Sequence, residues 1–232
     1  MCQTGFSRRG FVASAAALAC LPFASGFAPE APGTVAQPSA AEALTRLTAG
    51  NQRFVNGSDT HHLDAEAHRL ITAGGQQPFA MLLSCSDSRV PPEIVFDQGI
   101  GALFVARVAG NYASPGAIGS FEYAIDHFQP PLIVVLGHEA CGAIVATIGA
   151  VKAHQTVPGD LGKIVEAIEP AVIAAQSESG NAVQNAIREN VRLTIGNLKK
   201  NSSLIAAESA AGKLKIVGAE YALATGRVEI LS

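Results

Sequence analysis

The stretch FAMLLSCSDSR, residues 79–89, joins a short apolar run directly to a polar loop. An apolar run of this length, bounded by polar residues, is typical of a strand buried on both faces of a sheet. Two further runs follow at 102–106 and 132–136, and helical patterns lie near 116–128 and from about residue 141. Short buried strands that alternate with helices predict an α/β fold, with a mainly parallel β-sheet flanked by helices.

Before this unit, the chain carries the pattern of an arm-like N-terminal helix. Residues 40–56 place apolar side chains at helical intervals. Ser39 is a candidate N-cap and Gly57 a candidate stop signal.

After this unit, the patterns predict two helices and two strands. Residues 161–176 read as a helix, and 183–198 carry apolar residues at spacings of four and three, which indicates an amphipathic helix. Strands near 214–219 and 227–231, linked by a turn at Thr225-Gly226, are expected to close one edge of the sheet.

The first 28 residues have the order of segments found in an export signal. Paired arginines at Arg8-Arg9 precede an apolar run at 12–21, and small residues follow at 24–26. This order predicts a twin-arginine signal peptide at 1–28, and hence a periplasmic or secreted protein. An N-terminal membrane anchor or an ordinary buried helix is the alternative interpretation.

Two details accompany this leader. The sequence before Cys20 resembles a lipobox, so lipoprotein anchoring at Cys20 is a further alternative. Residues 29–39 are rich in Pro, Ala and Gly without periodicity, which predicts a flexible linker. The globular domain is therefore expected at 40–232.

Charge and hydropathy limit the classes of partner. The formal net charge is -3, and no run of Lys or Arg follows the first ten residues, so nucleic acid is not an expected partner. No stretch of 18 uninterrupted apolar residues follows residue 28, so no membrane span is expected in the mature chain. A mean hydropathy of +0.27 fits the leader, an aliphatic core or a large subunit interface.

Two polar loops each follow a predicted buried strand, SCSDSR at 84–89 and GHEACG at 137–142. Ligands bind at the carboxyl ends of strands in open α/β sheets, so both loops can line one crevice. Cys85, His138 and Cys141 would then lie within reach of one ion. Two thiolates and one imidazole are ligands that Zn²⁺ takes, with a fourth position left for water as in catalytic sites.

Other interpretations of the same residues stay open. Cys85 and Cys141 can form a disulfide in an oxidising compartment, can be inert core thiols, or one can be a nucleophile served by His138. The disulfide leaves His138, Asp87 and Arg89 unexplained, and the nucleophile leaves the second cysteine idle. Zinc accounts for the most residues.

Three motifs carry a resemblance to a known family: CSDSRV at 85–90, ARVAGN at 106–111 and GHEACGA at 137–143. In order and spacing they resemble the signature stretches of β-class carbonic anhydrases, over roughly residues 40–232. The resemblance implies the β-carbonic anhydrase fold and one Zn²⁺ per subunit, held by Cys85, His138 and Cys141. It also implies reversible hydration of CO2 to bicarbonate and a proton.

The resemblance also implies a role for Asp87 and Arg89. Arg89 keeps Asp87 ionised, and Asp87 orients the hydroxide that zinc generates from water. In one subclass the counterpart of Asp87 leaves its Arg and takes the fourth position on the metal, so Asp87 is also a candidate metal ligand. That subclass commonly has Trp three residues before the first Cys ligand. Leu82 stands there, which favours the form with water on the metal.

The family's substrate pocket maps onto four further positions. Gln76 matches a glutamine that hydrogen-bonds bicarbonate, and Phe104 and Tyr123 match apolar walls, partly supplied by a second subunit. Plain core packing is the alternative for Phe104 and Tyr123. Gly137 is expected to admit the substrate because a side chain there would crowd it. A homodimer or homotetramer follows from the family.

The same residues are compatible with two functions other than CO2 hydration. A related zinc hydrolase acting on carbonyl sulfide or carbon disulfide would keep all five site residues. A nonenzymatic zinc or redox protein would use the two cysteines alone, and Asp87 with Arg89 argues against it. No histidine stands out as a proton shuttle, and solvated faces are expected for the remaining histidines, His61, His62, His68, His127 and His154.

Overall fold

The computed structural model describes residues 36–61, 63 and 65–231. The proposed signal peptide, Cys20, His62 and most of the predicted linker lie outside these residues. The last residues of that linker are described, and the Gln37 side chain donates hydrogen bonds to the carbonyls of Pro78 and Phe128, at 3.1 and 2.8 Å. Among the described helices, none is long and apolar enough to cross a membrane.

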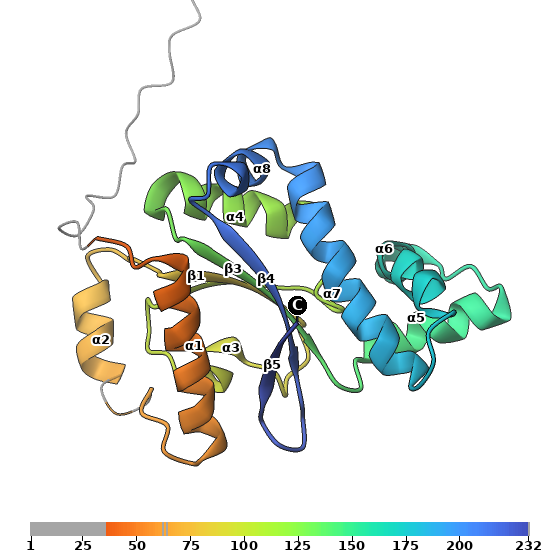
Figure 1. Cartoon of the computed structure of the whole chain (residues 1–232), viewed down its shortest axis with the longest axis horizontal. Coiled ribbons are helices and arrows are strands. Elements are labelled where there is room, and N and C mark those ends of the chain that lie inside the picture. The colour runs from red at the N-terminus through yellow and green to blue at the C-terminus, as the bar shows by residue number, and fades with distance from the viewer. Residues whose placement is uncertain (1–35, 62, 64, 232) are drawn as a thin grey trace, which may run out of the picture.

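A five-stranded sheet forms the centre of the molecule, in the order β2-β1-β3-β4-β5 (Figure 1). The first four strands in this order pair in parallel, and β5 is antiparallel to β4. The mainly parallel sheet predicted from the sequence is confirmed. The strands are β1 (Ala80–Ser84), β2 (Leu103–Arg107), β3 (Leu132–His138), β4 (Lys215–Tyr221) and β5 (Val228–Leu231).

Helices cover both faces of this sheet. The five helices expected from the sequence are confirmed to within a few residues, whereas α2, α3 and α8 were not predicted. The helices are α1 (Ala40–Val55), α2 (Ala65–Thr72), α3 (Pro92–Val95), α4 (Pro115–Phe128), α5 (Gly142–Ala153), α6 (Gly159–Ala175), α7 (Ala182–Asn201) and α8 (Ser203–Ala210).

Alternate residues of the central strands enter two different cores, because successive side chains of a strand point to opposite faces. Leu82 of β1 packs with Leu47 of α1, and Leu83 packs on the other face with Phe121 of α4. All five residues of β1 and all seven of β3 are buried. This burial explains why both strands read as continuous apolar runs.

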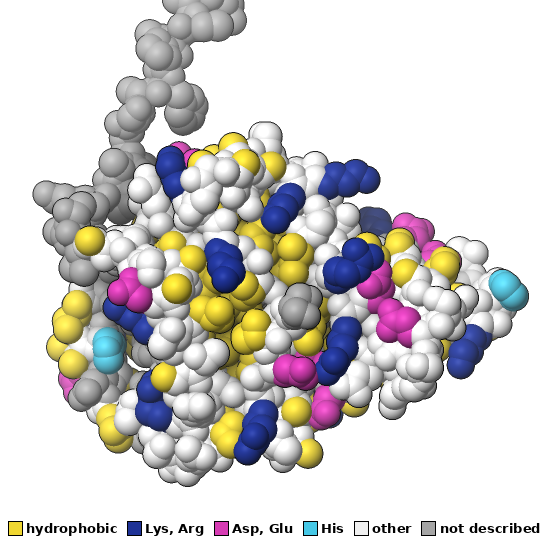
Figure 2. Space-filling view, viewed as in Figure 1, with side chains coloured by type: hydrophobic (Ala, Val, Ile, Leu, Met, Phe, Trp, Pro, Cys, Tyr) yellow, Lys and Arg dark blue, Asp and Glu magenta, His cyan; other side chains and the backbone are white. Residues whose placement is uncertain are grey.

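The first helix begins where the sequence predicts. The Ser39 side chain accepts the Glu42 backbone N–H, and the Glu42 carboxylate accepts the Ser39 N–H, which completes a capping box. The helix lies on the sheet, with Ala43 and Leu47 in the core. Figure 2 shows hydrophobic side chains gathered in the middle of the face between α1 and α7, where β4 and β5 lie in Figure 1.

A buried carboxylate joins α1 to the segment that follows α3. The Asp97 side chain has no exposed surface and accepts hydrogen bonds from the backbone N–H groups of Thr60 and His61, both at 2.6 Å. Arg53 of α1 donates its Nε–H to the other carboxylate oxygen. Burial alone would raise the pKa of Asp97, but these donors outweigh burial and lower the pKa to about 2. His61 is therefore half-buried against Asp97, although a solvated position was expected.

We expect Asp97→Asn to destabilise the protein at pH 7 by about 1–3 kcal/mol, because the new amide group faces N–H donors and leaves one without a partner. The lowered pKa of Asp97 stabilises the fold above the unfolded value of about 3.9, and this contribution is lost as the pH falls toward about 2. The difference in unfolding free energy between the two proteins should therefore shrink between pH 5 and pH 2.5. Urea titrations at both pH values measure this difference in unfolding free energy. A difference that does not change with pH would contradict the lowered pKa of Asp97 in the folded protein.

Candidate functional site

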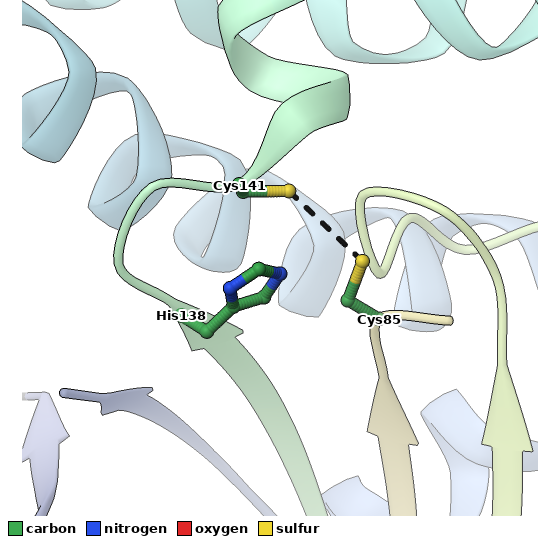
Figure 3. A group of neighbouring side chains, drawn as sticks. All are labelled: Cys85, His138 and Cys141. Carbon is green, nitrogen blue, oxygen red and sulfur yellow. Dashed lines mark hydrogen bonds between the residues drawn. The ribbon is translucent and has the colours of Figure 1, made fainter. Parts of the chain in front are cut away.

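Three potential metal ligands converge at the carboxyl edge of the sheet (Figure 3). Cys85 follows the last residue of β1, His138 is the last residue of β3, and Cys141 is the N-cap of α5. β1 and β3 are neighbours, and the chain runs from β1 outward to β2 before it returns to β3. The site thus lies where the direction of strand order reverses, the usual ligand position in such sheets. The ligand atoms all lie within 4.8 Å of one another.

The group is shielded from solvent. Cys85, His138 and Cys141 are exposed by 4%, 0% and 1%. The two cysteines pack in a third apolar cluster with Ile144 of α5 and Ile168 of α6. A site with this little solvent strengthens electrostatic interactions between an ion and its ligands.

The separation of the two sulfurs distinguishes between the interpretations of the cysteines. Both are free, and their Sγ atoms lie 4.0 Å apart. A disulfide requires about 2.05 Å, so the pair is not bonded. Two sulfurs about 2.3 Å from a tetrahedral zinc lie roughly 3.8 Å apart. The observed spacing matches two thiolate ligands of one zinc ion.

The imidazole of His138 is oriented to bind a metal. Its Nδ1 lies 2.9 Å from the carbonyl oxygen of Glu139, which has to accept, so Nδ1 carries the proton. Nε2 therefore carries a lone pair, and it faces the two sulfurs (Figure 3). Nε2 is buried and has no hydrogen-bond partner in the described part of the chain. Buried polar atoms are seldom left unpaired, and a metal ion held by the three side chains would satisfy this one.

The two cysteines interact through a hydrogen bond between their sulfurs. A hydrogen bond from the Cys141 thiol lowers the pKa of Cys85, burial opposes this effect, and the neighbouring His138 imidazole and Gly110 N–H add to the lowering. The same hydrogen bond and burial raise the pKa of Cys141. One thiolate is thus available at neutral pH, and thiolate is the form that metals bind.

Asp87 and Arg89 form a closed ion pair at the mouth of this group. Arg89 donates to Asp87 through its backbone N–H and Nε at 2.9 Å and through Nη2 at 2.7 Å. The hydrogen bonds from the Arg89 side chain hold the pKa of Asp87 well below its usual range. Asp87 Oδ2 lies 4.0 Å from Nε2 of His138. The carboxylate therefore stands beside the ligand group and not within it.

Arg107 was missed as a site residue by the sequence reasoning. It ends β2, and its Nε and Nη2 donate to the carbonyl oxygens of Cys85 and Asp87, at 2.9 and 2.6 Å. One guanidinium thus holds the turn that carries both Cys85, a candidate metal ligand, and Asp87. Its place in the ARVAGN motif was the available signal, but the target atoms are backbone carbonyls, which no side-chain pattern reveals.

Gln76, Phe104 and Tyr123 are not brought to Cys85 within one chain. Gln76 is exposed and precedes β1, at the opposite edge of the sheet from the metal ligands. The Phe104 and Tyr123 rings lie 6.2 Å apart between centroids and pack with Phe128. Tyr123 is 44% exposed, so these rings form a half-open aromatic cluster on β2 and α4.

Gly137 lies beside the site but faces a helix. A Cβ atom there would lie 2.8 Å from Cγ2 of Val191 and 3.1 Å from Cγ2 of Ile187, both on α7. The absent side chain therefore allows α7 to approach β3 closely. The structure supplies a packing reason for this glycine where a substrate reason was expected.

Comparisons with known proteins agree with this geometry. The family model described as carbonic anhydrase matches residues 80–228. Carbonic anhydrase 2 of Mycobacterium tuberculosis is 40% identical over 181 residues, which cover 78% of this chain and 87% of the relative. The chain belongs to the carbonic anhydrase family. A carbonic anhydrase of Mycolicibacterium smegmatis is also 40% identical, over 80% of this chain and 90% of the relative.

Solved structures place this carbonic anhydrase in the β class. The β-carbonic anhydrase CcaA has a TM-score of 0.62 at 28% identity, over 82% of this chain and 95% of the other. A Coccomyxa β-carbonic anhydrase in complex with acetazolamide has a TM-score of 0.63 at 25% identity, over 81% and 86%. The protein is thus a lyase whose expected reaction is hydration of CO2, with zinc as its metal.

Proposed function

We propose that Cys85, His138 and Cys141 hold one Zn²⁺ per chain, and that Asp87 with Arg89 acts directly beside it in the hydration of CO2. The buried and unpaired Nε2 of His138, facing two sulfurs 4.0 Å apart, carries the proposal. When bound, Zn²⁺ acts as a Lewis acid that brings the pKa of water from 15.7 to about 7 and so supplies a nucleophile at neutral pH.

The role of Asp87 follows from its charge and position. Arg89 occupies both carboxylate oxygens on one side and keeps the group ionised, so Asp87 can only accept hydrogen bonds. Oδ2 stands 4.0 Å from His138 Nε2, at the entrance to the ligand group. A proton of the attacking water that points to Oδ2 leaves the oxygen lone pair directed at the carbon of CO2. Arg107 maintains this arrangement because it holds the carbonyl of Asp87.

The Asp87–Arg89 pair also bears on the fourth metal position. Asp87 can become a metal ligand only if it gives up its hydrogen bonds to the Arg89 side chain. Their presence supports a resting form in which this position stays available to water. Leu82, at the position where the switching subclass commonly has Trp, supports the same form.

Stopped-flow hydration of CO2 tests the activity, on protein whose zinc content per chain has been measured. We expect a rate far above that of buffer, abolished by a strong chelator and restored by Zn²⁺. Parallel assays with carbonyl sulfide and carbon disulfide separate the related hydrolase activities. Zinc-loaded protein with no CO2 hydration above buffer would refute the proposed function.

A second copy of the chain is proposed to complete the substrate pocket. Gln76, Phe104 and Tyr123 cannot reach Cys85 of their own chain, and the half-buried edge strand β2 leaves one side of the sheet open for a neighbour. The apolar face over β4 and β5 in Figure 2 supports a further contact, and hence a homodimer or homotetramer. Sedimentation measures the assembly. A monomer with full activity would contradict this part of the proposal.

Export through the twin-arginine route to the periplasm is proposed from residues 1–28. This route is understood to carry folded proteins, so zinc can occupy Cys85 and Cys141 before they meet an oxidising compartment. With Arg8 and Arg9 both replaced by Lys, the protein should stay in the cytoplasm. Cell fractionation tests this prediction, and release of the protein only by detergent would instead support lipid anchoring at Cys20.

The protective role of folded export has a separate test. The leader is replaced by one that exports unfolded chains, and zinc per chain is measured. Normal zinc content would contradict the protective role.

A further inference from the structure

A backbone N–H group reaches the sulfur of Cys85 from the side opposite β3. Gly110, just beyond β2, donates this hydrogen bond at 3.3 Å. Gly110 has φ of +78°, and a Cβ atom there would lie 2.4 Å from Cδ1 of Ile168. The left-handed backbone favours glycine at this position, and any side chain there would have to displace the end of Ile168.

A buried side chain from a distant helix holds the Gly110 backbone in place. Asn190 of α7 is 3% exposed, and its Nδ2 donates to the carbonyl oxygen of Gly110 at 2.8 Å, across 80 positions of sequence. The same peptide is held at its other end, where the Asn111 N–H donates to the carbonyl of Val108 at 2.9 Å. Glycine has more backbone freedom than any other residue. Loss of the hydrogen bond from Asn190 would therefore allow the Gly110 backbone to turn.

We infer that Asn190 is a positioning residue of the metal centre, which holds Gly110 so that its N–H donates to the Cys85 sulfur. This inference rests on the proposed zinc site. A hydrogen bond to a thiolate withdraws negative charge from the sulfur and thereby limits the charge that reaches the metal. With zinc held by two thiolates and one imidazole, weaker donation from the Cys85 sulfur would leave the ion a stronger Lewis acid.

Asn51 offers a matched control. It is also a buried asparagine on a helix, and its Nδ2 donates to the carbonyls of Val95 and Gly226 at 3.0 and 2.8 Å. Neither of these backbone groups is bonded to a metal ligand. Asn51 Oδ1 also accepts the Val228 N–H at 2.9 Å, so a variant at Asn51 removes three hydrogen bonds where one at Asn190 removes one. It therefore loosens the fold at least as much, without touching the hydrogen bond to Cys85.

The experiment compares Asn190→Leu with Asn51→Leu in the full protein. The Leu side chain has the same number of heavy atoms and the same branching as Asn, so it fills the position and keeps water out. The carbonyl oxygen of Gly110 then loses its hydrogen-bond donor. Zinc affinity is measured by competition with a chelator, and the sulfur-to-metal charge-transfer band is recorded after replacement of zinc by Co²⁺. For Asn190→Leu we expect zinc affinity to fall about 10- to 100-fold. The cobalt band should move to longer wavelength, because a sulfur without the N–H donor gives up an electron more readily.

The position of the cobalt band decides the outcome. For Asn51→Leu we expect a lower melting temperature with the wild-type band and wild-type zinc affinity. A wild-type band in Asn190→Leu, or the same shift in Asn51→Leu, would overturn the inference. Asn190→Met, which also fills the position without a hydrogen-bond donor, gives the same comparison if the Leu variant does not fold. The band depends on Cys85 and not on turnover, so an inactive wild-type protein would refute CO2 hydration and leave this test intact.

Discussion

Cys85→Ala is expected to lose zinc and CO2 hydration together. The change removes one of three ligands and leaves Cys141 Sγ and His138 Nε2, two donors that cannot hold the ion in a tetrahedral site. Loss of a residue that merely supports a metal ligand typically costs 10–100-fold in affinity or activity, so loss of the ligand itself should cost more than about 100-fold. Zinc per chain is measured by atomic absorption, and the rate by stopped flow.

Ser84→Ala is the control for this variant. Ser84 precedes Cys85 and is fully buried, and the only side-chain hydrogen bond found for it in the described structure is a long one of 3.5 Å to the Cys85 carbonyl. We expect this variant to retain one zinc per chain and most of its activity. Full zinc occupancy in Cys85→Ala would show that the metal is bound elsewhere.

Asp87→Asn is expected to keep zinc and lose rate. The ligand group consists of Cys85, His138 and Cys141, so the metal should remain at one per chain. The Asn side chain has no negative charge, so it is a weaker acceptor for the proton of the attacking water. Its amide also has only one acceptor oxygen for the two hydrogen bonds from the Arg89 side chain. Residues that handle a proton in the transition state contribute about 10²- to 10⁴-fold, and we expect kcat to fall within that range.

The same substitution at Asp97 separates this effect from a general loss of stability. Asp97 is also a carboxylate held by an arginine, but it lies on the segment after α3 and contacts Arg53, Thr60 and His61. Asp97→Asn should therefore lower stability and leave kcat nearly unchanged. A fully active Asp87→Asn enzyme would refute the role assigned to the Asp87–Arg89 pair.

Much of the fold was predictable because its signals are local. β1 and β3 are buried on both faces, so each appears as an unbroken apolar run, and each is followed at once by a polar loop. The parallel arrangement then brings Cys85 and His138 to the same edge of the sheet, which made the metal group predictable from the order of elements alone. Ser39 was likewise visible as a cap because it stands directly before the helical pattern of residues 40–56.

The features that were missed depend on contacts between distant parts of the chain. The helix α3 is a single turn that starts at Pro92, too short to show a period, and α2 has no buried residues to mark one. The roles of Arg107 and Asn190 consist of bonds to backbone carbonyls, whose positions only the folded chain defines. The environment of Gly137 depended in the same way on the packing of α7.

Two of the three proposed metal ligands, Cys85 and His138, lie at the ends of the neighbouring strands β1 and β3, and this placement links metal binding to the exchange of backbone amides in the sheet. A ligand that binds only the native state raises the free energy of global opening, by about 4 kcal/mol at a free concentration 1,000 times its Kd. Since Cys85 directly follows β1 and His138 ends β3, and these two strands pair with each other, opening of this pair would also separate the two side chains. Zinc should therefore slow hydrogen exchange in the middle of the sheet, far from the metal, while exposed α2 keeps its rate.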